Sequence, residues 1–149
     1  MIVEVTRKGA GRNYPTGELK KITAAILKAL ERSQAELSIA LVGDKEMRPL
    51  NAEYRKKNKT TDVLSFPADN PATAKRVLLG DVIISVEQAR RQAKERNHSL
   101  KREMVILLTH GILHLLGYDH ERSPRQAKIM ADLEVKLLNR LCERGLIKV

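Results

Sequence analysis

The sequence predicts an α+β fold in a single domain, in which a small mixed sheet packs with several helices. Its 149 residues can remove enough apolar surface from water for one core, but two cores would be cramped. Short segments of alternating apolar residues are mixed with longer segments whose apolar residues recur at helical spacing. Because the two kinds do not follow one another as regular βαβ units, an α+β arrangement fits better than a doubly wound sheet.

Four segments have the residue pattern of β-strands. They comprise residues 2–6, 36–42, 62–66 and 76–85. The third is short and is stopped by Pro67, after which an irregular loop is expected up to about residue 75. The fourth, RVLLGDVIIS, is the strongest strand pattern in the chain.

Five further segments carry the pattern of helices, with apolar residues three and four positions apart. They span residues 16–33, 44–58, 86–96, 100–116 and the stretch from 124 onward. The segment 100–116 is apolar on nearly all sides, which predicts a helix that runs through the core. Asp44 is expected to cap the second helix, with Pro49 in its early turns. Ser85 and Ser123 have the spacing of N-caps for the third and the last helix.

The chain is strongly basic, with 28 Lys and Arg against 18 Asp and Glu and a formal net charge of +10 at pH 7. Such a charge raises the local concentration of polyanions, so nucleic acid is the expected partner. With one Phe, three Tyr and no Trp, the chain offers few surfaces on which bases could stack. Contacts to RNA should therefore be mainly to phosphate and should be sensitive to salt.

Cys142 is the only cysteine, so no internal disulfide can form, in agreement with a reducing compartment. We expect a half-buried small apolar role for it rather than a catalytic thiol. No secretory signal is apparent at the N-terminus, and no apolar stretch is long enough to span a bilayer. These features predict a cytoplasmic protein with no membrane partner.

Three of the four histidines lie within eleven residues, in the segment HGILHLLGYDH that begins at His110. His110 and His114 are four residues apart on a predicted helix, so their rings share one face, as two ligands of one metal ion must. Gly117 can end the helix in a left-handed conformation, which lets the chain double back and present His120. Three imidazoles with a fourth position open to water are typical of catalytic zinc, which we favour over ordinary core histidines.

The spacing H-x-x-x-H-x-x-G-x-x-H matches the ligand skeleton of the metzincin peptidases. Those enzymes carry a glutamate general base directly after the first histidine, where this chain has Gly111. Without a carboxylate there to activate water and protonate a leaving amine, hydrolysis of peptides is disfavoured.

Three sequence blocks resemble the YbeY-type endoribonucleases, a family of ribosomal RNA maturation factors. The first is the histidine segment itself, HGILHLLGYDH. The second consists of LNAEYR at residues 50–55 followed by TDVLSFP at residues 61–67, and the third is LGDVIIS at residues 79–85. With their surroundings, the blocks span most of the chain from about residue 40 to 122.

The resemblance implies a zinc ion on His110, His114 and His120 and cleavage of single-stranded RNA during ribosomal RNA processing. Precursor ribosomal RNA is then the expected substrate, with ribosomal proteins or the small ribosomal subunit as further candidate partners. Zinc would coordinate a phosphate oxygen or carry the attacking hydroxide, and RNA also brings its own nucleophile, the 2′-hydroxyl. The sequence does not distinguish the two attacks.

Taken alone, Arg55 and the lysines after it resemble a solvated basic end of a helix. Given the resemblance, we assign Arg55 to the scissile phosphate, because a guanidinium can grip two phosphate oxygens and stabilise developing charge. Lys56, Lys57 and Lys59 would hold neighbouring phosphates. The family often has Asp where this chain has Asn58, which adds positive character to this face.

Four other polar or aromatic residues lie within or near these segments. Asp119 could support a ligating imidazole or cap the turn after the zinc helix, and both alternatives stay open. For Asp81 we expect a structural hydrogen bond at a β-bulge. Tyr118 is expected to be half-buried packing, and His98 ordinary surface.

Two alternative functions remain for testing. One is a non-enzymatic assembly factor that binds ribosomal RNA or a ribosomal protein and uses zinc only to hold its fold. The other is a divergent zinc peptidase or small-substrate hydrolase, against which the glycine at position 111 and the basic composition both argue.

Overall fold

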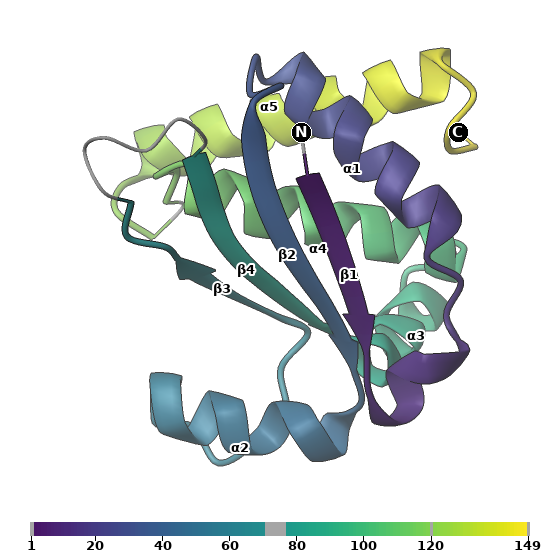
Figure 1. The fold of residues 1–149 in the computed structure, drawn as a ribbon, viewed down its shortest axis with the longest axis vertical. Helices are drawn as coiled ribbons and strands as arrows, with labels where there is room; N and C mark the ends of the chain where they lie inside the picture. The colour runs from purple at the N-terminus through teal and green to yellow at the C-terminus, as the bar shows by residue number, and fades with distance from the viewer. Residues whose placement is uncertain (1, 71–76, 120, 149) are drawn as a thin grey trace.

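The sheet of the computed structural model, which describes residues 2–70, 77–119 and 121–148, has four strands in the order β1-β2-β4-β3. The strands are β1 (Ile2–Arg7), β2 (Ala35–Val42), β3 (Val63–Pro67) and β4 (Val77–Ser85). The first three strands in spatial order are parallel, and β3 pairs antiparallel with β4 at one edge (Figure 1). The sheet is therefore mixed, as predicted.

Five α-helices and one short 3-10 helix connect and cover the described strands. They are η1 (Gly9–Asn13), α1 (Gly17–Ala29), α2 (Asp44–Arg55), α3 (Val86–Glu95), α4 (Leu100–Leu115) and α5 (Pro124–Glu143). The α+β class is confirmed, with helices on both faces of a small sheet (Figure 1). None of the helices in the described ranges is long and apolar enough to cross a membrane.

The alternation of side chains along β2 separates two apolar clusters. Leu37, Ile39 and Leu41 are buried in the main core, which they share with α1, α4 and α5. Val42 faces the other way and packs with Met47 of α2, in a smaller cluster that also includes β3. The edge strand β3 contacts α4 on one face and packs with α2 on the other, so side chains of both helices border this strand.

Helix α4 runs through the core, as its apolar sequence predicts. Its N-cap is Ser99, whose hydroxyl accepts a hydrogen bond from the Arg102 amide at 3.1 Å. The predicted caps Ser85 and Ser123 are confirmed, because their hydroxyls accept from the amides three residues later, at 3.2 and 3.1 Å. Pro49 lies inside α2, as expected.

Two predicted helix ends and one predicted cap are wrong. The helix expected up to residue 58 ends at Arg55, because Lys56 takes a left-handed conformation with a φ of 56°. The helix expected up to residue 33 ends at Ala29, and Glu31 has a φ of 58° just after it. The N-cap of α2 is Gly43, and Asp44 is its first helical residue. Of the loop expected between β3 and β4, residues 71–76 lie outside the described residues.

Asp44 does not cap its helix because its carboxylate binds three other segments. It accepts hydrogen bonds from Thr60 at 2.9 Å, from Ser85 at 2.9 Å and from Arg91 at 2.6 Å. Burial alone would raise the pKa of Asp44, but the hydrogen bonds from Arg91, Ser85 and Thr60 outweigh it and hold the pKa below its usual value of 3.8. The carboxylate thus joins α2, the end of β4, α3 and the segment that leads into β3.

Replacing Asp44 by Asn should lower the free energy of unfolding near neutral pH by about 1–2 kcal/mol, since the charged hydrogen bonds are lost. A carboxyl group whose pKa is lower in the folded than in the unfolded state stabilises the fold at pH values above its pKa in the unfolded state. This stabilisation disappears as the pH falls through the pKa of the folded state. The difference between wild type and Asp44→Asn should therefore shrink below about pH 4. Urea unfolding between about pH 7 and pH 3 measures it.

The exposed Asp69 offers the control for this comparison. Asp69→Asn should leave the unfolding free energy within about 0.5 kcal/mol of wild type at every pH. A deficit of Asp44→Asn that stays constant down to about pH 3 would show that its charge does not provide the stabilisation.

Candidate functional site

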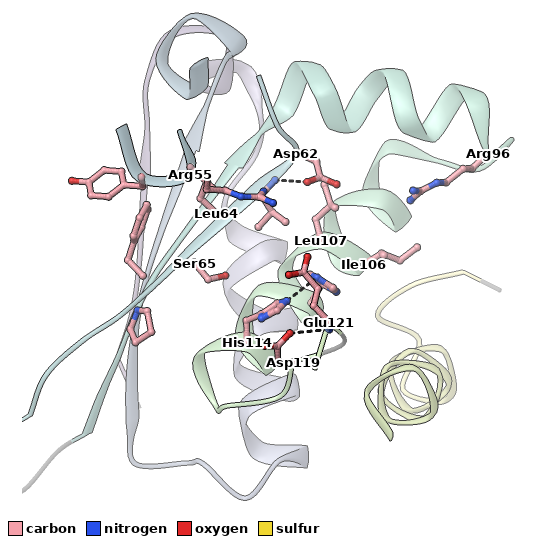
Figure 2. Close-up of a pocket in the computed structure, with 15 residues that line it drawn as sticks. Arg55, Asp62, Leu64, Ser65, Arg96, Ile106, Leu107, His114, Asp119 and Glu121 are labelled. Atoms are coloured by element: carbon pink, nitrogen blue, oxygen red, sulfur yellow. Dashed lines mark hydrogen bonds between the residues drawn. The ribbon is translucent and has the colours of Figure 1, made fainter. Parts of the chain in front are cut away.

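A cleft of about 780 Å³ runs along the edge strand β3 (Figure 2). Its walls come from the C-terminal end of α2, the outer side of β3, the second half of α4 and the segment just after α4. His110 and His114 line it together with Arg55, so the structure brings three of the predicted site residues into one cavity.

The two histidines of α4 point their Nε2 atoms at one another. These atoms lie 3.1 Å apart, and the ring centroids of His110 and His114 are 4.7 Å apart. Gly117 has a φ of 97° and ends α4, with the Tyr118 amide donating to the Leu113 carbonyl at 3.0 Å, as predicted. The third predicted ligand, His120, lies outside the described residues, so its position stays a prediction.

A carboxylate of α5 orients the first histidine. His110 Nδ1 lies 3.0 Å from Glu134 Oε1, and both side chains are partly buried. Such a contact keeps a proton on Nδ1, which leaves the lone pair of Nε2 directed into the cleft. Sequence reasoning missed Glu134, although its place beside the apolar stripe of the last helix, next to Leu133, was a usable signal.

The pair has the donor chemistry and spacing of two ligands of one transition-metal ion. Two nitrogens at about 2.0–2.1 Å from a tetrahedral zinc are roughly 3.3 Å apart, close to the 3.1 Å between the Nε2 atoms. Within the part of the chain that the structure describes, no group of three or more His, Cys, Asp or Glu side chains could hold a metal. The predicted third ligand, His120, is not among these residues, so the three-histidine metal site stays a prediction.

Gly111 faces the sheet and not the cleft, which explains the departure from the metzincin pattern. A Cβ atom at this position would lie 2.8 Å from Val82 Cγ1 and 3.2 Å from Ser65 Oγ. The Ser65 hydroxyl also donates to the Gly111 carbonyl at 3.3 Å. A glutamate at 111 would force α4 away from β4, so the peptidase base is excluded here by packing as well as by sequence.

Arg55 is the last residue of α2, and Figure 2 shows its guanidinium pointing toward the carboxylate of Asp62, another lining residue of the cleft. The side chains of Lys56, Lys57 and Lys59 are exposed and follow in the next turn, but they do not line the cavity. The buried Asn51 holds this turn, because its side-chain amide donates to the Lys59 carbonyl at 2.8 Å. The predicted phosphate-binding lysines thus lie beside the cleft, on the side of Arg55.

A fully buried carboxylate lies behind the cleft, on the first turn of α4. Glu103 accepts hydrogen bonds from Gln92 at 2.8 Å and from Arg96 at 2.7 Å, and Arg96 itself lines the cleft. Gln92 also donates to Asp62 at 3.3 Å. Glu103 therefore restrains two charged side chains of the cleft wall, Arg96 directly and Asp62 through Gln92. Sequence reasoning missed this network, which a lone acidic residue within an apolar helix could have indicated.

The prediction that His98 is ordinary surface is wrong. Its Nε2 lies 2.6 Å from Glu103 Oε1, and its side chain is only 20% exposed. The reason is that the chain turns sharply between α3 and α4, with a left-handed Asn97, which folds His98 back onto the buried carboxylate.

Of the other three residues, Asp119 and Tyr118 behave as predicted and Asp81 does so only in part. Asp119 caps the turn after α4 by accepting from the Glu121 amide at 2.9 Å (Figure 2). Tyr118 is half-buried against the core, which confirms its packing role. The bulge expected near Asp81 is present, since the register between β2 and β4 skips Leu79. Asp81 itself is exposed and makes no side-chain hydrogen bond among the described residues, so the structural hydrogen bond expected of it is wrong.

The family model of Endoribonuclease YbeY matches residues 5–142 of this chain. The chain belongs to the YbeY family. A YbeY endoribonuclease of Sulfurihydrogenibium sp. (strain YO3AOP1) is 51% identical over 126 residues, which cover 84% of this chain and 83% of that protein. One of Aquifex aeolicus (strain VF5) is 45% identical over 130 residues, covering 87% and 86%.

The fold agrees with this membership. The solution structure of a Thermotoga maritima protein matches with a TM-score of 0.69 and 26% identity, over 97% of this chain and 91% of that one. The resemblance to YbeY noted in the sequence is confirmed, and an endoribonuclease is favoured over a non-enzymatic assembly factor.

Proposed function

We propose that this chain is a zinc-dependent endoribonuclease that cleaves single-stranded precursors of ribosomal RNA in the cytoplasm. The main support is the cleft, which joins a converging histidine pair to an arginine at the end of another helix. The YbeY relatives are named endoribonucleases, and a net charge of +10 suits a polyanionic substrate. Ribosomal proteins or the small ribosomal subunit are further proposed partners.

The zinc would be held by His110, His114 and His120. When bound, it would supply a Lewis acid for a phosphate oxygen and lower the pKa of nearby water. Glu134 would keep His110 in the tautomer that exposes Nε2 and would hold its ring in place.

Arg55 would bind the scissile phosphate and offset the negative charge that develops on its oxygens. Its guanidinium enters the cleft from the end of α2, whereas the histidines enter from α4, so a phosphate between them would meet both walls. Arg96, held by the buried Glu103, is a second cation of the same cleft. RNA also carries its own 2′-hydroxyl nucleophile, and metal-bound water can ionise near neutral pH, so the lack of a carboxylate base at position 111 matters less than it would in a peptidase.

Glu134→Gln should weaken zinc binding by about tenfold, because a neutral amide oxygen stabilises the proton on Nδ1 of His110 less than a carboxylate does. Competition with a chromophoric chelator measures this, and Asp132→Asn, an exposed change on the same helix, is the control. Unchanged zinc affinity in Glu134→Gln would show that Glu134 does not support the metal ligand His110.

His114→Ala should bind far less than the one zinc per chain expected for wild type and should not cleave RNA.

Arg55→Lys should retain zinc and most RNA affinity, yet cleave about a hundredfold more slowly. Lysine keeps the positive charge but offers a single ammonium where the planar guanidinium can contact two oxygens. Single-turnover cleavage of single-stranded RNA at saturating enzyme isolates this effect from binding. Equal rates for the two proteins would return Arg55 to a role in binding only.

The triple variant Lys56→Asn, Lys57→Gln, Lys59→Gln should flatten the dependence of RNA affinity on salt. Asparagine at position 56 tolerates the left-handed backbone there. Since each contact to a single-stranded phosphate contributes a slope of about 0.7, the loss should be about 2. The control is Arg90→Gln with Lys94→Gln on α3. If that pair alone changes the slope, RNA binds along α3 instead.

A further inference from the structure

Two of the four aromatic side chains in this protein lie in the cleft. Tyr54 and Phe66 line it, whereas Tyr14 and Tyr118 pack against the main core. Tyr54 is 58% exposed, the highest fraction among the large apolar side chains of the described residues. An exposed aromatic ring in a hollow needs an explanation, because burying it would be favourable.

Phe66 holds the Tyr54 ring in place without covering it. The two ring centroids are 4.7 Å apart with an interplanar angle of 63°, an edge-to-face contact. Phe66 is itself packed against the small cluster between α2 and the sheet, so it is a fixed support. A contact of this kind covers at most one face of the tyrosine, and the other face stays available for a flat ligand.

Tyr54 directly precedes Arg55 at the end of α2, and both side chains line the cleft. A nucleotide carries its phosphate and its flat base on one sugar, so a phosphate at Arg55 places a base near Tyr54. Stacking on aromatic side chains is open to every base and does not depend on sequence. In a duplex, by contrast, both faces of a base are already stacked on its neighbours.

We propose that Tyr54 is a stacking platform for one unpaired nucleobase next to the phosphate held by Arg55. This inference rests on the proposed endoribonuclease function and adds a reason for its selectivity for single-stranded RNA. The phenol hydroxyl has no part in stacking, so the ring alone should suffice.

The absence of tryptophan from the chain allows a direct test. In a Tyr54→Trp, His114→Ala protein, a single-stranded oligoadenylate should quench the fluorescence of the only tryptophan. The same RNA paired with its complement should not. The matched control is Ile2→Trp in the same background, since Ile2 is exposed on β1 at the opposite edge of the sheet. Anisotropy of dye-labelled RNA measures binding independently.

Quenching in the Tyr54→Trp protein but not in the Ile2→Trp control, and by single strands alone, is the expected result. Anisotropy could show binding while the tryptophan fluorescence of the Tyr54→Trp protein is not quenched, or is quenched equally by the duplex. In either case the stacking proposal is wrong, while the proposed function stands. If neither RNA binds the wild-type protein in the anisotropy measurement, both proposals fall.

A second comparison separates stacking from a structural role. Tyr54→Phe should keep wild-type affinity for single-stranded RNA, whereas Tyr54→Leu, which keeps an apolar side chain, should lose roughly tenfold. Tyr54→Phe should unfold at the wild-type urea concentration, and Tyr54→Leu at a slightly lower one, because it loses the edge-to-face contact with Phe66. A loss of stability in Tyr54→Leu with unchanged RNA affinity would mean that the ring only covers the small core.

Discussion

The close contact between α4 and β4 at Gly111 is the constraint on which the site depends. A single methyl group there would already collide with Val82, so the helix can lie this near the sheet only with glycine. Because His110 precedes this glycine and His114 follows it by three residues, turning Gly111 toward the sheet turns both rings toward the cleft. The Ser65 hydroxyl, bonded to the Gly111 carbonyl, ties the edge strand β3 to the same point.

Two carboxylates then restrain the groups that this packing brings together. Glu134 holds a histidine ring from α5, and Glu103 holds Arg96 and, through Gln92, Asp62. A fully buried charge costs free energy unless every oxygen is paired, and the three donors around Glu103 meet that need. The cleft itself mixes cations with acids, so the excess positive charge lies mainly outside it, where it can attract RNA over a distance.

Much of the fold could be predicted because its signals are local. Strand alternation, helical spacing and the Ser85 and Ser123 caps depend on residues within a few positions of each other, and all were confirmed. The ends of α1 and α2 were not predicted, because they depend on left-handed backbone at Glu31 and Lys56, residue types that carry no such preference. Asp44 looked like a cap from its neighbours, but partners up to 47 residues away bind its carboxylate.

The sequence by itself determined the chemical types at the site: two histidines one helical turn apart, a glycine that ends the helix after them and an arginine in a basic segment. The histidines and the glycine follow from spacing along one helix, which backbone geometry converts directly into a shared face, and the arginine follows from the resemblance to the YbeY family. Only the tertiary structure decided that Glu134 supports His110, that His98 joins a buried carboxylate and that Tyr54 stays exposed beside Arg55. Those outcomes depend on how separate helices pack against one sheet, and no local pattern specifies which side chains such packing brings together.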